Sequence, residues 1–375
     1  MKVLFVTHYG SLYGANLSMV ALMDDLVKRY GVEVAVIVPP NTELSLLLQK
    51  KGIPFFETKY FWWQSCNPTF LKNILKRFIN TFRIKKSVAF AKNFSPDIIH
   101  SNSSVIDLGY QISRKIKCKH LWHLREFGKL DYQMEYIVKK KKVIKEYSQS
   151  NALIAISKCI FNFYQPLTIT NNLFMIHNGI NDEQILQRTR CDINRVEFCV
   201  VGLLSQTKNQ LEVLHAVSEL IDKKYSGFHV SFFGDGDEYK QIMVNYIKEN
   251  NLSDFITLNG YLPNASSKLH EFDIGIVSSL CEAFGRVTVE YMFAKLPVIG
   301  TNTGGTPEII LDNKTGFLYE SGKPTDLARK MAFFIDNKET INVFGNAGYQ
   351  RATECFSINS NTDKVFKLYK KVLNN

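Results

Sequence analysis

Short apolar runs and amphipathic segments alternate along most of this chain. The runs at 2–7, 32–38 and 53–57 have the length and residue types of buried strands, and the segments at 16–29 and 43–51 place apolar residues at helical spacing. Further strands are predicted at 96–100, 119–124, 152–157, 197–203, 230–233, 256–262, 273–277 and 297–300. Strands that alternate with helices form a parallel sheet with helices on both faces. The pattern therefore predicts an α/β fold.

The length of the chain predicts more than one domain. A single hydrophobic core stops growing at about 250 to 300 residues, and this chain has 375. Residues 182–195 are polar and charged, so a domain boundary is predicted near residue 190. The predicted domains are 1–190 and 191–360, and a last helix at 361–375 is expected to pack back on the first domain.

The stretch 277–310 combines a loop, a helix and a buried strand. Residues 282–285 (Glu-Ala-Phe-Gly) form a small-residue turn, and residues 286–295 then show the apolar spacing of a helix. Residues 297–300 (Pro-Val-Ile-Gly) fit a short buried parallel strand, and two glycines follow at 304–305. Open α/β sheets bind ligands at the carboxyl ends of their strands, so this stretch is a candidate binding site.

The residues of this stretch suit a ligand that carries both phosphates and hydroxyls. Gly285 lets a ligand approach the backbone just before the helix, whose first N–H groups and macrodipole favour a phosphate, and Arg286 adds a positive charge. Glu282 and Glu290 flank the turn. Carboxylates beside a phosphate are well placed only when they accept hydrogen bonds from neutral hydroxyls, as in a nucleotide sugar. By itself, a glutamate pair at this spacing is more often two solvated charges.

The signature of the retaining family 4 glycosyltransferases (glycosyl transferases group 1) is E-x-F-G-x(4)-E, then P-V-I, then G-G-x-x-E. This chain resembles it at Glu282, Phe284, Gly285, Glu290, Pro297, Val298, Ile299, Gly304, Gly305 and Glu308. The resemblance is close over 197–320 and mainly topological before that. It implies the GT-B fold, in which two Rossmann-like domains face each other across a cleft. The first domain would bind the acceptor and the second the nucleotide-sugar donor.

The same resemblance implies roles for individual residues. Glu282 would bind the hydroxyls of the sugar, Glu290 the ribose, and His123 the transferred sugar, although a histidine at a strand's end is more often structural. The implied catalytic residues are Glu282, His123 and Lys208. The implied donor-binding residues are Gly14, Ala15, Lys208, Tyr261, Leu262, Glu282, Phe284, Gly285, Arg286, Val287 and Glu290.

One position departs from the family pattern. Lys208 lies at a predicted helix N-terminus, where a lysine is poorly placed unless an anion binds there, and it matches the family's lysine on the donor diphosphate. Leu203 stands where the family often has an arginine. The departure puts part of the phosphate clamp in doubt, and Arg286 offers a compensating charge.

The implied activity is metal-independent transfer of a sugar, with retention, from a nucleotide-diphosphate sugar, with a UDP-sugar favoured. The implied acceptor is a lipid-linked glycan in bacterial surface polysaccharide synthesis, such as capsule. No cofactor or metal is expected. Asp235-x-Asp237 resembles a metal-binding D-x-D motif, but it lies at a strand-to-helix turn where acidic residues serve as caps, and the capping interpretation is favoured.

The charge of the chain adds a second expectation. Its formal net charge is +11, and residues 58–95 contain no Asp or Glu. Apolar residues recur at helical spacing over 71–86, with basic residues mostly off that stripe. Such a helix can lie on an anionic membrane surface. The alternative, in which the stripe packs on the domain's own sheet, has equal weight.

Cellular location and rival functions follow from what the sequence lacks. Seven cysteines lie far apart with no C-x-x-C pair, and no apolar run is long enough to span a bilayer, so a reduced cytoplasmic protein, peripheral on the inner face of the cell membrane, is expected. The loop Gly10-x-x-x-Gly14 is neither a dinucleotide fingerprint nor a P-loop. The remaining rivals are a non-catalytic nucleotide-sugar or nucleic-acid binding protein and a sugar-nucleotide epimerase of the same fold. The glutamate pair is needless for the first, so no nucleic-acid partner is expected.

Overall fold

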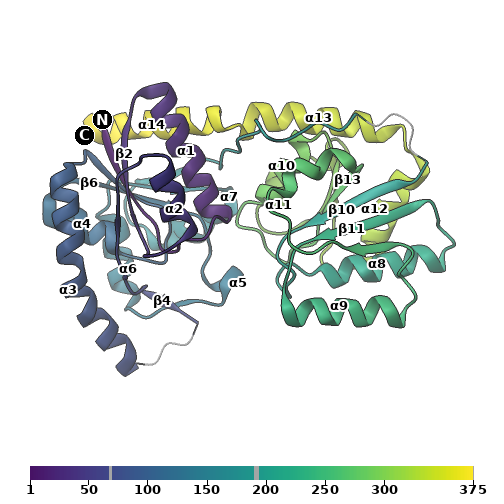
Figure 1. The fold of residues 1–375 in the computed structure, drawn as a ribbon, viewed down its shortest axis with the longest axis horizontal. Helices are drawn as coiled ribbons and strands as arrows, with labels where there is room; N and C mark the ends of the chain where they lie inside the picture. Colours follow the sequence, from purple (N-terminus) through teal and green to yellow (C-terminus); the bar gives the residue numbers. More distant parts are fainter. Residues whose placement is uncertain (67–69, 190–193, 375) are drawn as a thin grey trace. The chain divides into compact units, whose positions relative to one another are not determined.

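The structure is a computed structural model that describes residues 1–66, 70–189 and 194–374, and the side chains of 70–74 lie outside this description. The chain divides into two compact units. Unit 1 comprises Met1–Gly179 and Ile358–Asn375, and unit 2 comprises Ile180–Ser357. Each unit is an α/β structure with its own parallel sheet (Figure 1).

The sheet of unit 1 has the strand order β3-β2-β1-β5-β6-β8-β9, and every pairing in it is parallel. Apolar residues fill the strands because helices cover both faces. Its strands are β1 (Lys2–Val6), β2 (Glu33–Val38), β3 (Phe55–Glu57), β5 (Ile98–Ser101), β6 (Lys119–Leu124), β8 (Ala152–Ala155) and β9 (Leu173–Met175), and a separate antiparallel pair consists of β4 (Gln64–Ser65) and β7 (Glu135–Tyr136).

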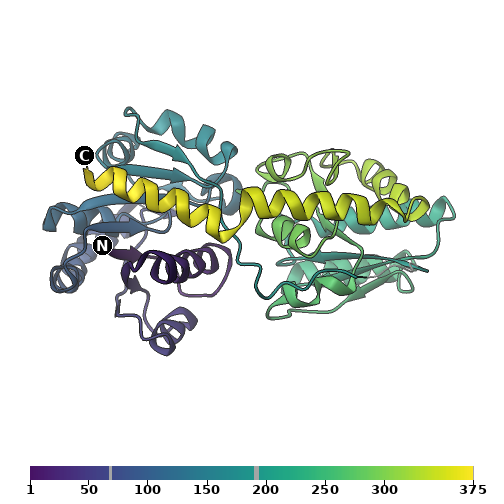
Figure 2. The same ribbon diagram turned by 90° about the horizontal axis from the view of Figure 1, so that it is seen from above.

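The helices of unit 1 include the last helix of the chain. They are α1 (Gly14–Tyr30), α2 (Glu43–Lys50), α3 (Phe70–Phe94), α4 (Leu108–Ile116), α5 (Lys129–Tyr132), α6 (Lys140–Ser148), α7 (Lys158–Tyr164), the 3-10 helix η1 (Gln165–Leu167) and α14 (Ile358–Asn374). Helix α14 lies beside α1, as Figures 1 and 2 both show. Asp363 accepts hydrogen bonds from Arg29 Nη2 at 2.5 Å and from Tyr30 Oη at 2.6 Å, and Phe366 stacks on the Tyr30 ring at 3.8 Å.

The sheet of unit 2 has the order β12-β11-β10-β13-β14-β15 and is also parallel. Helices α8, α9 and α12 pack together on one side of it, and α10 packs on α13 on the other. The strands are β10 (Val196–Val201), β11 (Phe228–Phe233), β12 (Ile256–Leu258), β13 (Ile274–Val277), β14 (Val298–Thr301) and β15 (Gly316–Tyr319). The helices are α8 (Gln210–Asp222), α9 (Asp237–Glu249), the 3-10 helix η2 (Ala265–Glu271), α10 (Arg286–Phe293), α11 (Thr306–Ile309), α12 (Pro324–Asp336) and α13 (Thr340–Phe356).

The strand order reverses once in each sheet, and this reversal positions the candidate sites. In unit 1 the chain moves outward from β1 to β3 and then returns to place β5 on the other side of β1. In unit 2 the same reversal places β10 beside β13. At such a point the loops that follow the two central strands diverge to opposite faces of the sheet and leave an opening for a ligand.

The division between the units lies before the predicted boundary. The prediction near residue 190 falls on 190–193, which are outside the described residues, and the units divide between Gly179 and Ile180. The polar segment that suggested the boundary is held by unit 2: Arg188 donates from its backbone N to Ala294 O at 2.9 Å and from Nε to Asp273 Oδ1 at 2.9 Å. The composition of this segment suggested that it is exposed, yet the buried Arg188 ties its described residues to unit 2.

No helix in the described part of the chain is both long enough and apolar enough to cross a membrane.

We predict that Arg188→Ala destabilises unit 2 by about 3 to 5 kcal/mol, because Asp273 is then left as a buried charge without its ion pair. Arg195→Ala is the matched control. Arg195 pairs with Glu197 at 2.7 Å, but its side chain is 53% exposed, so we expect a loss of at most about 1 kcal/mol. Urea unfolding followed by circular dichroism measures both changes. Equal losses in the two variants would contradict the assignment.

Candidate functional site

The loops after β10 and β13 bring Lys208 and Glu282 together in unit 2. Lys208 Nζ lies 2.6 Å from Glu282 Oε1, and Ser279 Oγ donates to the same oxygen at 2.6 Å. Burial alone would raise the pKa of Glu282, but the charge and hydrogen bond of Lys208 and the bond from Ser279 outweigh it and hold the pKa below its usual value. Glu282 is therefore an ionised carboxylate at neutral pH.

Backbone hydrogen bonds hold these loops against each other. Ser278 Oγ donates to Lys208 O at 2.8 Å, and Leu280 N donates to Thr207 O at 2.9 Å. Gly304, which the sequence singled out, is required here: its φ is +57°, and a Cβ on it would lie 2.4 Å from Glu282 O. A side chain at this position would push the Glu282 loop away, so the glycine fixes the carboxylate.

The amino end of α10 lies directly after this loop. Gly285 precedes the helix with a φ of +101°, which favours glycine, and Phe284 is buried against the ring of Phe356. Arg286 Nη2 pairs with Glu290 Oε1 at 3.0 Å along the first turn. The structure thus sets the predicted cation and the predicted ribose-binding carboxylate side by side. Phe284 anchors the turn, and the half-buried Val287 follows Arg286 on the helix.

The remaining predicted residues of unit 2 lie at the ends of neighbouring strands. Tyr261 and Leu262 follow β12, and the Tyr261 side chain is 59% exposed. Leu203 follows β10 and is 64% exposed, so the position that often carries an arginine in family 4 presents an apolar side chain here. The positive charges of this region come from Lys208 and Arg286.

Gly14 and Ala15 begin α1 in unit 1, and a buried amide shapes the loop before them. Asn16 Nδ2 donates to Tyr9 O at 3.0 Å and to Ser11 O at 2.9 Å, while Thr7 Oγ1 donates to Asn16 Oδ1 at 2.7 Å. Ala15 O accepts a hydrogen bond from Asn102 Nδ2 at 3.1 Å. The loop after β1 is therefore tied to the residue that follows β5.

His123, at the end of β6, belongs to a buried network in unit 1. Its Nδ1 lies 3.0 Å from His100 Nε2 and 3.2 Å from Arg125 Nη2. His100 Nδ1 lies 2.5 Å from the hydroxyl of Tyr369 on α14, and Arg125 Nε donates to Asn102 Oδ1 at 2.7 Å. Burial first, then the charge of Arg125, lowers the pKa of both histidines well below the usual value. Both rings are neutral at pH 7.

The fixed charge of Arg125 sets the tautomer of His123. A guanidinium only donates, so Nδ1 of His123 is an acceptor and the ring proton is on Nε2. His100 then donates from Nε2 to His123, and its own Nδ1 accepts from Tyr369. His123 Nε2 is buried and has no hydrogen-bond partner among the described residues. His123 is thus a hydrogen-bond donor held ready for an acceptor atom, and its low pKa makes it unsuitable as a general base.

Sequence reasoning missed the residues that support His123: His100, Asn102, Arg125 and Tyr369. Arg125 carries the one local signal, because an arginine two positions after an apolar strand's histidine is rarely buried without a role, and it is 6% exposed. Tyr369 lies 269 positions from His100 and gave no signal at all.

Asp235 does not cap α9 as the sequence suggested, because the N-cap residue is Gly236 and no side chain makes a capping hydrogen bond there. Its Oδ1 accepts from Gly236 N at 3.1 Å and pairs with Lys240 at 3.2 Å, ahead of α9. Within the described residues, no three His, Cys, Asp or Glu side chains are arranged to hold a metal ion.

Known proteins resemble this chain in fold and in sequence. Two parallel sheets, each with one reversal of strand order, are the architecture of the GT-B fold. A protein of Anabaena, HepE, crystallised with UDP and glucose, shares the fold with a TM-score of 0.79 over 98% of both chains at 18% identity. Residues 181–351 match the family model for Glycosyl transferases group 1. The chain therefore carries a glycosyl transferases group 1 domain and is a glycosyltransferase, as the resemblance implied.

Curated relatives agree with this class. An uncharacterized glycosyltransferase of Methanocaldococcus jannaschii is 28% identical over 72% of this chain and 74% of its own length. A poly(ribitol-phosphate) alpha-N-acetylglucosaminyltransferase of Staphylococcus aureus is 24% identical over 66% and 49%. An Escherichia coli UDP-Gal:alpha-D-GlcNAc-diphosphoundecaprenol alpha-1,3-galactosyltransferase is 24% identical over 80% and 82%. The first matches span about half to three quarters of the relatives' length.

We predict that His123 keeps its proton on Nε2 and stays neutral at the pH where a histidine ordinarily titrates, because burial and Arg125 both oppose its protonation. Long-range nitrogen NMR of the imidazole rings reports the tautomer and any titration. In Arg125→Met the fixed donor is absent, and we expect signals of the second tautomer. A ring that titrates near pH 6.5 in the wild type would refute the argument.

Proposed function

We propose that this protein transfers a hexosyl group from a UDP-sugar to a lipid-linked glycan, with retention and without a metal, in bacterial surface polysaccharide synthesis. The observation that carries the proposal is the pairing of Lys208 with an ionised Glu282, beside the amino end of α10, where the strand order of unit 2 reverses. This arrangement combines a site for an anion with a carboxylate that can accept hydrogen bonds from hydroxyl groups.

Lys208 and α10 supply the positive charge that the leaving diphosphate needs. As the bond from the sugar to the phosphate breaks, negative charge grows on the phosphate oxygens, and an ammonium with helix N–H groups stabilises it. Arg286 lies on the first turn of the same helix and is held by Glu290. In this proposal, these fixed charges replace a metal ion.

Glu282 suits the recognition of sugar hydroxyls better than it suits nucleophilic attack. Its Oε1 accepts hydrogen bonds from Lys208 and Ser279, and these bonds lower the basicity of the carboxylate. A carboxylate with a lowered pKa accepts hydrogen bonds well and is a weak nucleophile. This favours displacement on the same face of the sugar, in which the leaving phosphate takes the proton of the acceptor hydroxyl, over a glycosyl-enzyme intermediate.

Unit 1 offers a hydrogen-bond donor for the sugar. His123 Nε2–H is positioned by Arg125 and has no other partner among the described residues, so it is suited to an oxygen of the transferred sugar. Gly14 and Ala15 begin a helix after a glycine loop, which suits close approach of a diphosphate. In the proposed assignment, Tyr261 and Leu262 hold the base and Glu290 holds the ribose.

The identities of donor and acceptor draw on the relatives. The name of the E. coli relative contains UDP-Gal and a diphosphoundecaprenol acceptor, and the Anabaena structures contain UDP. These support a uridine nucleotide and an acceptor on a lipid diphosphate for this chain.

We expect UDP to bind in the presence of chelator and to bind at least about tenfold more weakly to Lys208→Ala, because a charge-assisted contact with a phosphate contributes about 1.5 to 3 kcal/mol. Glu290→Ala should weaken UDP binding to a similar degree and leave the binding of inorganic diphosphate unchanged, since the proposed partner of Glu290 is the ribose. Isothermal titration calorimetry with UDP, GDP and ADP measures these affinities.

Lys240→Ala provides the control for general charge, because Lys240 lies on the surface of the same unit and pairs with Asp235. Its UDP affinity should equal that of the wild type. Binding that needs a divalent metal, or equal weakening in Lys240→Ala and Lys208→Ala, would count against the proposed donor site.

Helix α3 supports the proposed membrane contact. Leu75, Phe78 and Phe82 lie on one side of the helix and are 60%, 60% and 55% exposed, so the alternative in which this stripe packs on the sheet does not hold for them. The stripe residues Leu71 and Ile74 lie outside the described side chains. Lys85 and Lys86 follow on the same helix, and apolar residues flanked by lysines suit an anionic membrane surface.

We expect the double variant Phe78→Ser and Phe82→Ser to lose at least about tenfold in affinity for vesicles of phosphatidylglycerol, because each ring would leave the lipid interface. Vesicle flotation measures this. Leu46→Ser is the matched control, since Leu46 is 67% exposed on α2 of the same unit and should have no effect. Equal binding of the wild type to phosphatidylcholine and phosphatidylglycerol would exclude an electrostatic interface.

A further inference from the structure

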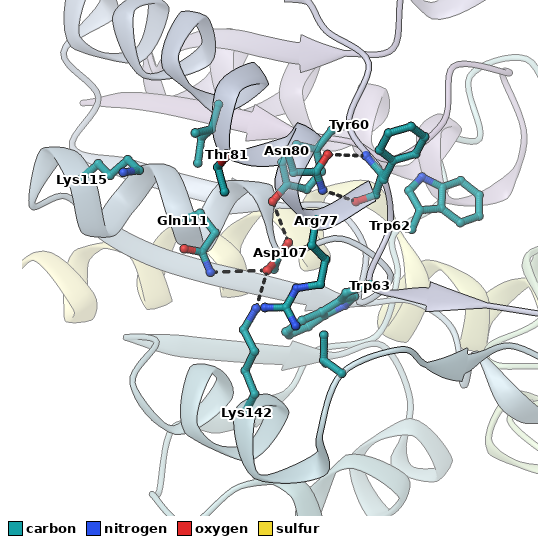
Figure 3. Close-up of a pocket in the computed structure, with 13 residues that line it drawn as sticks. Tyr60, Trp62, Trp63, Arg77, Asn80, Thr81, Asp107, Gln111, Lys115 and Lys142 are labelled. Atoms are coloured by element: carbon teal, nitrogen blue, oxygen red, sulfur yellow. Dashed lines mark hydrogen bonds and ion pairs between the residues drawn. The ribbon is translucent and has the colours of Figure 1, made fainter. Parts of the chain in front are cut away.

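Unit 1 contains a pocket that none of the roles above uses (Figure 3). It encloses about 220 Å³ between α3, α4, the start of α6 and the segment after β3. Figure 3 shows Tyr60, Gln111 and Lys142 converging on Asp107, with Arg77 extending toward the same end of the pocket. Lys115 lines the pocket from α4.

Two of the four aromatic residues that line the pocket, Phe61 and Trp63, are engaged through their ring faces. Trp63 stacks on Trp122 at 5.3 Å between ring centroids, and Lys142 Nζ lies 5.8 Å from the Trp63 ring. The guanidinium of Arg83 lies 4.8 Å from the Phe61 ring. Sugars stack on open ring faces, and the engaged faces of Phe61 and Trp63 are therefore poor places for a sugar to stack.

The hydrogen-bond acceptors of the pocket are also engaged. Asp107 Oδ1 accepts from Tyr60 Oη at 2.9 Å, and Asp107 Oδ2 accepts from Lys142 Nζ at 3.1 Å and from Gln111 Nε2 at 3.4 Å. Asn80 uses both ends of its amide on the backbone of Phe61, at 3.0 Å and 2.8 Å. These bonds engage both carboxylate oxygens of Asp107 and both ends of the Asn80 amide.

The hydrogen-bonding groups of the pocket that remain available are positively charged donors. Among the described residues, Arg77 and Lys115 make no hydrogen bond or ion pair, and an ammonium keeps a third hydrogen when, like Lys142, it contacts two carboxylates. The second of these is Glu146, at 3.3 Å, and burial followed by the charge of Asp107 raises its pKa to about 7. The three cations therefore exceed the nearby negative charge, and residues 58–95 add no acid.

We propose that this pocket binds a phosphate group through Arg77 and Lys142, whose side chains lie at the same end of it (Figure 3). The inference deepens the proposed function, because a glycosyltransferase whose acceptor is lipid-linked needs a contact for the phosphate of that acceptor or for an anionic lipid head group. A guanidinium and an ammonium group together match the several oxygens of a phosphate.

The pocket is connected to the candidate site of unit 1. Trp62, which lines the pocket, donates from Nε1 to His8 O at 3.2 Å, and its ring meets the His8 ring at 5.2 Å. His8 begins the loop that leads from β1 to Gly14 and Ala15. An acceptor held by its phosphate in the pocket would thus lie next to a loop of the candidate site.

The test is calorimetric titration of inorganic phosphate and of glycerol 3-phosphate into Lys208→Ala, a background in which phosphate binding at the proposed donor site is weakened. We expect binding of both probes, and a loss of at least tenfold when Arg77→Gln is added. Arg114→Gln is the matched control, since Arg114 is exposed on α4 and does not line the pocket, and it should change nothing. Equal affinities with and without Arg77→Gln, or no binding of either probe, would overturn the proposal.

Two further measurements separate the source of the phosphate from the failure of the proposed function. If the head group of a lipid is the source, inorganic phosphate should displace the wild type from phosphatidylglycerol vesicles and not displace Arg77→Gln. If the acceptor is the source, Arg77→Gln should float like the wild type and still bind the soluble probes more weakly. UDP affinity of Arg77→Gln should equal that of the wild type. A wild type that binds phosphate but does not bind UDP would refute the donor site. The assignment of the phosphate site in the pocket would still stand.

Discussion

Parallel strands that are buried on both faces can meet a ligand only at their ends. Both units obey this constraint, since apolar side chains fill their sheets and helices cover both sides. The reversal of strand order then decides where an opening can form. In unit 2 the reversal lies at β10 and β13, which are followed by Lys208 and Glu282, and in unit 1 it lies at β1 and β5, which are followed by Ala15 and Asn102. The polar residues of both candidate sites therefore occupy the places that the topology leaves open.

The two units solve the problem of burying polar groups in opposite ways. Unit 2 keeps charge: Lys208 and Glu282 neutralise each other, and the pKa of Glu282 remains low. Unit 1 removes charge: His100 and His123 are held neutral beside one fixed guanidinium, which orders their protons by donation alone. The first arrangement suits phosphates and hydroxyls, and the second suits a single directed hydrogen bond.

Local patterns predicted what depends on neighbours in the sequence. Strand runs, the turn at 282–285 and Lys208 before α8 were all visible, because a helix start, a glycine turn and an apolar strand each have a signature within a few residues. The alternating apolar runs also predicted two α/β domains, which the fold confirms. Long-range partners were not predictable. The Arg286–Glu290 pair joins neighbours on one helix, whereas the contact of Tyr369 with His100 forms only because helix α14 belongs to unit 1. The division between Gly179 and Ile180 was not predictable for the same reason, since Arg188 finds its partner Asp273 85 positions away.

Helix α14 has a consequence for how the protein is made. It follows unit 2 in the sequence, yet it packs on α1 and supplies the hydroxyl that reaches His100. Domains generally fold as units during synthesis, the N-terminal one first. Here the ribosome must translate all of unit 2 before the histidine network of unit 1 can close. A nascent unit 1 would therefore wait, with the face that receives α14 uncovered, and translation pauses or chaperones acting late in synthesis would influence the yield of active protein.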